Sequence, residues 1–169
     1  LYNLTKHGNR KVIFILGKGR LLNQSIVSKK PNALFCEAAC PVQVIEIAEK
    51  QFLQLMEQSH ALTRAVLREY ERNLWRMGHQ LKNTTGNMQM ERKIAAKLWK
   101  LGRDFGVDTE DGVMIDIDLT ITLMADLVGA PRENVSRACK VLTDRGLIRY
   151  GNKRFILIDF DGLAEFYKM

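Results

Sequence analysis

The sequence predicts an α+β protein built from three consecutive parts. Residues 1–47 contain short apolar runs separated by glycine and proline, which is typical of strands and turns. Residues 48–87 lack proline and end in a polar segment, which predicts one long helix followed by a hinge. Residues 88–169 combine helical patterns with a short hairpin, in the order of a winged helix-turn-helix.

The composition is that of a globular protein. Apolar residues make up 46% of the 169 residues, which is ample for packed cores in two small domains. No run of about eighteen uncharged apolar residues occurs, so we expect no membrane span. Three cysteines without a repeated short spacing favour a reducing compartment, the cytoplasm, over a disulfide framework. Because Leu1 begins the chain inside a strand-like segment, we expect that upstream sequence is missing.

Two apolar runs predict strands in the N-terminal part, one at Val12–Leu16 and one at Val42–Ile47. Gly17, Gly19 and the pair Pro31-Asn32 lie between the two runs and predict turns. So few strands are expected to form only part of a β domain.

One long helix is predicted from about Ala48 to Leu81, because helix formers dominate there. In its second half an apolar residue recurs at alternating spacings of three and four, as in the seam of a two-stranded coiled coil. A homodimer is therefore expected, with packing against the chain's own domain as the alternative. The residues of this seam are Leu67, Tyr70, Leu74, Met77 and Leu81.

Four arginines step by four along the same helix, at positions 64, 68, 72 and 76. They fall at outer heptad positions, which predicts a solvated face, with an anionic ligand or DNA phosphate as the alternative. The polar segment from Lys82 to Asn87 breaks the helix and predicts the hinge. A further helix is expected from about Met90 to Phe105, ending near Gly106.

Residues 119–158 carry the strongest pattern of the chain. If Ile121 is the first position of a helix-turn-helix, then Ala125 is the fifth, Gly129 the ninth and Val135 the fifteenth. The fifth side chain must be small because two helices cross there, the ninth residue needs a positive φ in the turn, and the fifteenth belongs to the core. Pro131 suits the first turn of the second helix.

The second helix is predicted to have a buried face and a polar face, and to stop at Gly146. Val135, Cys139 and Leu142 form the apolar face. Arginine donates two hydrogen bonds to guanine, and a carboxylate accepts one from cytosine, so the opposite face suits the edges of base pairs. Its residues are Arg132, Glu133, Ser136, Arg137 and Lys140.

A hairpin is predicted after this helix, with strands at 147–150 and 153–158 and a turn that begins with Gly151. Its basic residues favour phosphate as a partner, although a winged helix can also dock on a protein. The net charge of +7 lies entirely in residues 1–87, because residues 88–169 hold 13 basic and 13 acidic residues. Within the latter part, however, acidic residues crowd 104–118 and basic residues 132–154, so charge is sorted.

The stretch from Gly129 to Arg137, together with Leu142 and the run Gly146-Leu147-Ile148, closely resembles the CRP/FNR family of regulators. The resemblance spans the chain and implies four parts: a partial β-roll sensor of the cupin-like, cyclic-nucleotide-binding type, a dimerisation helix, a hinge and a winged helix-turn-helix. It divides the chain at residues 1–47, 48–87 and 88–169. It also implies a homodimeric, sequence-specific regulator of RNA polymerase, gated by a small effector.

The recognition helix resembles two branches of that family at once. Arg132, Glu133 and Arg137 match the readers of a TGTGA-like half-site, whereas Glu133, Ser136 and Arg137 match those of a TTGAT-like half-site. Both contain TGA, so we expect a palindrome built on TGA with a dyad spacing near one helical turn, about 34 Å. Contacts to the double-stranded DNA backbone are expected from Thr120, Thr122, Lys140, Lys153 and Arg154.

The effector is not identified by the sequence, and neither are the regulated genes or the sign of regulation. The family's cyclic-nucleotide cassette has a Gly-Glu-Leu-like stretch and a later Arg-Ser/Thr-Ala, whereas this chain has Gly19-Arg20-Leu21-Leu22 and Asn32-Ala33-Leu34. Cyclic AMP is therefore disfavoured. The tract Asn23-Gln24-Ser25 is read as a surface loop, with an effector pocket as the alternative.

Cysteine and histidine patterns favour no metal site. Cys36 and Cys40 are read as strand and turn residues, with a redox or metal role as the alternative, and Cys139 as core. The histidines at 7, 60 and 79 lack metal-ligand spacing, with His79 as a weak haem candidate. An enzyme with a Cys36 nucleophile is disfavoured, because nothing near that thiol would lower its pKa.

Overall fold

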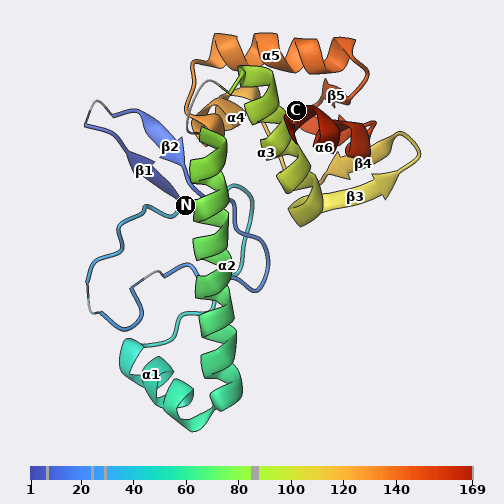
Figure 1. Ribbon diagram of the computed structural model, residues 1–169. Coiled ribbons are helices and arrows are strands. Elements are labelled where there is room, and N and C mark those ends of the chain that lie inside the picture. The colour runs from blue at the N-terminus through green and yellow to red at the C-terminus, as the bar shows by residue number, and fades with distance from the viewer. Residues whose placement is uncertain (7, 24, 29, 85–87, 169) are drawn as a thin grey trace.

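The computed structural model describes residues 1–6, 8–23, 25–28, 30–84 and 88–168, with the backbone alone at 82–84 (Figure 1). It confirms the α+β class. A long helix runs away from a compact C-terminal domain, and the N-terminal residues wind alongside that helix.

The N-terminal part is mostly irregular. Strands β1 (Tyr2–Leu4) and β2 (Arg10–Val12) form an antiparallel hairpin, and an isolated bridge joins Tyr2 to Phe35. The predicted strand at Val42–Ile47 is wrong, because this segment is irregular. Ile45 there is 92% exposed. A strand needs a neighbour to satisfy its backbone groups, and nothing pairs with this segment in the described chain.

Two helices replace the single long helix that was predicted. Helix α1 (Glu49–Gln58) ends at Ser59, whose backbone is extended, and helix α2 (His60–Thr84) begins directly after it. The Ser59 hydroxyl accepts a hydrogen bond from the Leu62 N–H at 3.2 Å, which is a helix cap at the new start. Helix α2 continues to Thr84, so the first half of the predicted hinge is helical; residues 85–87 lie outside the described residues.

The C-terminal domain surrounds a four-stranded antiparallel sheet in the order β3-β4-β6-β5. Helix α3 has the predicted bounds, and α6, a helix that was not expected from the sequence, packs against it. Ile94, Phe155 and Leu163 are fully buried between these elements. The elements are α3 (Met90–Phe105), β3 (Gly106–Thr109), β4 (Gly112–Ile115), α4 (Ile121–Val128), α5 (Arg132–Asp144), β5 (Ile148–Gly151), β6 (Arg154–Leu157) and α6 (Phe160–Lys168).

Candidate nucleic-acid interface

Helix α4 and its turn have the geometry that the position count predicts. The Thr120 hydroxyl caps α4 by accepting a hydrogen bond from the Leu123 N–H at 3.0 Å. Ala125 is buried where α4 meets its neighbours, and Val135 is fully buried. Gly129 ends the helix in the left-handed region, with φ of +74°. The three steric predictions for the helix-turn-helix are therefore confirmed.

Helix α5 has one buried and one exposed face. Val135, Ala138, Cys139 and Leu142 are buried in the domain core. Arg132, Glu133, Ser136, Arg137 and Lys140, all predicted for the polar face, are exposed together on the other side. An amphipathic helix of this kind leaves a continuous polar surface free for a ligand.

Local contacts fix both ends of α5 and orient one of its arginines. Pro131 occupies the capping position directly before α5, one residue earlier than the predicted first turn. Gly146, with φ of +70°, reverses the chain after the helix, as predicted. The Arg137 guanidinium donates to the Asn134 side-chain oxygen at 2.6 Å, which holds it along the helix surface.

The hairpin is present, but its turn differs from the prediction. Gly151 is the last residue of β5 and pairs with Arg154, so it does not begin the turn. Asn152 and Lys153 are the two central residues, with φ of 51° and 60°. Both values are positive, as the tight hairpin turn that matches strand twist requires, and asparagine tolerates them well. The exposed Lys153 therefore lies at the tip of the wing.

Acidic residues in the β3–β4 turn and in the segment directly after β4 meet the basic residues of the wing. Arg154 forms ion pairs with Asp116 and, at 3.6 Å, with Asp118. Arg149 pairs with Asp111 at 2.9 Å. The two stretches of opposite charge are thus brought together by the sheet, which reduces the charge that Arg154 offers to a phosphate. The exposed side chains of Lys140 and Lys153 are therefore the better candidates for that contact.

The predicted seam of α2 lies on the surface of the single chain. All five of its residues are exposed, and Leu74 is 74% exposed. A face of α2 that adjoins the seam contains the buried Val66, and Gln80 on this face donates to the Ile13 carbonyl of the N-terminal part at 2.9 Å. The helix therefore contacts its own chain through that face, while the side chains of the seam are exposed to solvent.

One of the four arginines on α2 departs from the predicted solvated face. Arg64 and Arg68 are exposed, and Arg72 lies 3.7 Å from Glu69. The side chain of Arg76, in contrast, is only 11% exposed and lies 3.5 Å from Asp104 of α3. Its guanidinium also covers the Phe14 ring, and burial lowers its pKa. Arg76 of α2 thus contacts both α3 and the N-terminal part.

Residues considered for sensing are spread over the molecule. Arg20 pairs with Glu69 of α2 at 2.7 Å, so the residue that replaces the cassette's carboxylate binds the chain's own helix. Cys36 and Cys40 are exposed, as are Asn23 and His60; Gln24 and His7 lie outside the described residues.

Cys139 lies in the core, whereas His79 lies on the surface. Cys139 is buried, as predicted, and burial raises the pKa of its thiol to about 11. The His79 ring lies 3.9 Å from the Trp75 ring on the exposed side of α2. In the described part of the chain, no group of three metal-ligating side chains comes together.

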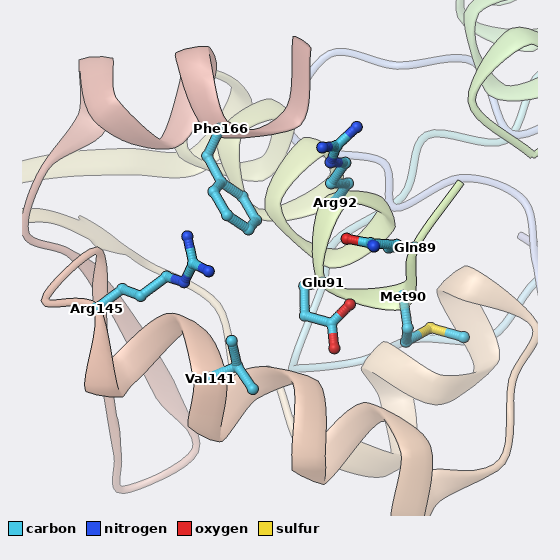
Figure 2. Close-up of a pocket in the computed structure, with 7 residues that line it drawn as sticks. All are labelled: Gln89, Met90, Glu91, Arg92, Val141, Arg145 and Phe166. Carbon is cyan, nitrogen blue, oxygen red and sulfur yellow. The ribbon is translucent and has the colours of Figure 1, made fainter. Parts of the chain in front are cut away.

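A groove of about 590 Å³ that the sequence did not indicate lies where α3 begins and α5 ends (Figure 2). The Arg145 guanidinium lies 5.0 Å above the Phe166 ring at one side of it, and Arg92 stands on the other. The residues that line it are Gln89, Met90, Glu91, Arg92, Val141, Arg145 and Phe166.

Comparisons with known proteins agree with this geometry. Residues 92–166 match the Crp-like helix-turn-helix domain. The chain is 24% identical over 159 residues to a CRP-like cAMP-activated global transcriptional regulator of Mycobacterium tuberculosis, covering 94% of this chain and 70% of that protein. It is 26% identical over 117 residues to the global nitrogen regulator of a Nostoc species, covering 69% of this chain and about half, 52%, of that protein.

Solved structures share the fold. A CRP/FNR-family transcriptional regulator from Thermus thermophilus has a TM-score of 0.77 at 20% identity, over 99% of this chain and 82% of that one. FixK2 from Bradyrhizobium japonicum has a TM-score of 0.69 at 17% identity, over 97% and 80%. These structures show the fold, and the match of residues 92–166 shows that the C-terminal domain is a Crp-like helix-turn-helix domain.

The C-terminal domain belongs to the Crp-like helix-turn-helix family, and the chain as a whole is similar to transcriptional regulators of the CRP/FNR family. This family consists of regulators rather than enzymes, which removes the interpretation of Cys36 as a nucleophile. No helix in the described part of the chain is long and apolar enough to cross a membrane.

Proposed function

We propose that this regulator binds, as a homodimer, a DNA palindrome built on TGA. The observation that carries the proposal is the exposed row on α5 opposite a completely buried face. Arg132, Glu133, Ser136 and Arg137 of that row would read base edges, with α5 in the major groove. Thr122, Lys140 and Lys153 would contact phosphates, while Thr120 already caps α4 and Arg154 already pairs with two aspartates.

The dimer of the proposal uses the seam of α2. Two-fold symmetry of the protein would match the palindrome, with the two recognition helices about 34 Å apart, one turn of DNA. The seam exposes leucines, a tyrosine and a methionine along the helix, and pairing would remove them from water. In this proposal, residues 1–47 form the sensor, residues 48–87 form the dimer helix and hinge, and residues 88–169 bind DNA.

The effector of the proposal is a small molecule other than cyclic AMP. The relative from Mycobacterium tuberculosis is described as cAMP-activated. In this chain, however, Arg20 replaces the carboxylate of the cassette and is engaged by Glu69. RNA polymerase is the proposed protein partner and the cytoplasm the proposed location, both by analogy with the family.

The test measures the affinity of the protein for labelled duplexes by fluorescence anisotropy. The duplexes carry a TGTGA palindrome, a TTGAT palindrome or a scrambled sequence. We expect Arg137→Ala to weaken binding to the preferred palindrome by about ten to one hundredfold, because one bidentate base contact is worth about 1–3 kcal/mol. Lys18→Ala removes an exposed charge from the N-terminal part and is the matched control. Equal affinity of Arg137→Ala and parent would refute the assignment of base readers.

The second candidate is a winged helix that docks on a protein, which the pairing of wing arginines with aspartates favours. The salt dependence of binding distinguishes DNA reading from protein docking, because phosphate contacts make DNA affinity fall steeply with added salt. A parent protein that binds palindrome and scrambled duplex equally weakly, with a shallow salt slope, supports protein docking.

A further inference from the structure

The N-terminal hairpin touches the helix-turn-helix directly. Strand β2 lies against α4, although more than one hundred residues separate them in the chain (Figure 1). The Lys11 ammonium donates a hydrogen bond to the Leu127 carbonyl at 2.9 Å. Beside it, the Arg10 guanidinium lies 3.9 Å from the Asp126 carboxylate. Val12, the next residue of β2, is 3% exposed and belongs to the core cluster of the C-terminal domain.

The position of Lys11 at α4 is chemically specific. Leu127 lies in the last turn of α4, where carbonyl groups lack partners within the helix and carry partial negative charge. The ammonium group of Lys11 donates a hydrogen bond to such a carbonyl and also places a positive charge beside its partial negative charge. A β-carbon on Gly129 would lie 2.7 Å from the Lys11 ammonium nitrogen. The glycine of the turn therefore provides the left-handed backbone and also the space for this lysine.

Both unfavourable and favourable electrostatic interactions act on the charged form of Lys11. Burial lowers the pKa of Lys11, the neighbouring Lys93 lowers it further, and Asp126 opposes both. Lys97 of α3 lies close enough to be affected by Lys11 and by Arg76 of α2. Cations from β2, α2 and α3 are thus close enough at the junction to repel one another.

We propose that Lys11 is a positioning residue for DNA reading: it ties the hairpin to the end of α4 and thereby orients α5. The proposal rests on the proposed function, since it concerns how the same face is presented. Because α4 and α5 are joined by the short turn at Gly129, a shift at the end of α4 moves the start of α5, where Arg132 and Glu133 lie. A change in the N-terminal part then reaches the recognition helix without passing through α2.

The experiment uses the full chain and the preferred palindrome. Lys11→Met keeps the aliphatic stem and removes the charged donor, while Lys11→Arg restores a charged donor. Lys18→Met is the control for loss of a lysine from the same region. We measure affinity for palindrome and scrambled duplex, hydrogen exchange of the turn amides at 129 and 130, and thermal unfolding.

We expect Lys11→Met to reduce the ratio of palindrome to scrambled affinity by about tenfold, since a hydrogen bond from a charged group is stronger than a neutral one and part of its energy acts on α5. Exchange at the turn should accelerate, and Lys11→Arg should recover most of both effects. A purely structural role would lower the unfolding temperature without changing the ratio, and that result overturns the proposal, as does a Lys11→Met protein identical to the parent.

If Lys11→Met does not fold, Lys11→Gln keeps a neutral donor and is judged by the same ratio and the same exchange. A parent that shows no preference for the palindrome argues against the proposed function itself. A parent with that preference and an unchanged Lys11 variant argues against the role of Lys11 alone, so the two failures are distinguishable.

Discussion

Similar apolar runs adopt different structures in the C-terminal domain and in the N-terminal part. In the C-terminal domain, β6 (Arg154–Leu157) pairs with a strand on either side, and Phe155 and Leu157 are fully buried. In the N-terminal part, Val42–Ile47 is also rich in apolar residues but forms no strand, and Ile45 is almost completely exposed. An apolar pattern therefore becomes a strand only where neighbouring backbone and a covering layer are present.

The largest expected effect is on the free energy of unfolding, which should respond very differently to substitutions in these two regions. Phe155→Ala should lower the free energy of unfolding by about 3–5 kcal/mol, because it empties space in a closed core. Ile45→Ala should change it by less than about 0.5 kcal/mol. Urea unfolding followed by circular dichroism measures both. A loss above about 2 kcal/mol for Ile45→Ala, the size typical of a buried residue, would mean that residues 42–47 are buried in solution and would break the comparison.

The seam of α2 offers the next effect, because it too leaves apolar residues uncovered in one chain. Leu74→Asp should weaken self-association by about one hundredfold or more, since a carboxylate would have to enter a coiled-coil interface. Trp75→Asp alters another large exposed residue, beside the seam, and should change self-association by less than about threefold, as surface substitutions usually do. Sedimentation velocity over a range of concentrations gives both values, and equal behaviour of the two variants contradicts the proposed seam.

The C-terminal domain follows closely from its sequence, because its signals are local and steric. Gly129 needs a left-handed backbone, Ala125 needs to be small, and α5 alternates its faces with helical spacing. Each requirement involves residues only a few positions apart. The predicted bounds of α3 and the exposed row on α5 were therefore correct. The turn at Asn152-Lys153 was misplaced because glycine is permitted, but not required, next to a positive-φ pair.

What the sequence did not predict depends on residues far apart in the chain. The ion pairs of Arg154 with Asp116 and of Arg76 with Asp104 arise when β4, β6, α2 and α3 meet. Likewise, the contact of Lys11 with α4 spans much of the chain and has no local signal. The extra helix α6 is short, and its apolar face becomes meaningful only against α3. Long-range placement, rather than residue type, limits such predictions.

The smallest expected effect concerns the junction between the two regions. Burial, with Lys11 and Arg76 nearby, lowers the pKa of Lys97 from 10.5 to about 8. Between these values the unfolded chain holds more protons than the folded one, so the free energy of unfolding should rise with pH across that window. Below pH 8 the full cost of burying the charge is present, about 2 kcal/mol when the shift is discounted for partial hydration.

Lys97→Met should therefore stabilise the protein by about 1–2 kcal/mol at pH 7 and remove most of that rise. The measured quantity is the difference between variant and parent in urea unfolding from about pH 7 to the ordinary lysine pKa, near 10.5. The difference is needed because the pKa of Cys139, raised from 9.0 to about 11, acts in the opposite direction above pH 9 in both proteins. Lys168→Met, at the exposed end of α6, is the control and should follow the parent curve. A Lys97→Met curve parallel to the parent's would show that the junction does not bury this charge, and that β2, α2 and α3 do not crowd their cations as the structure indicates.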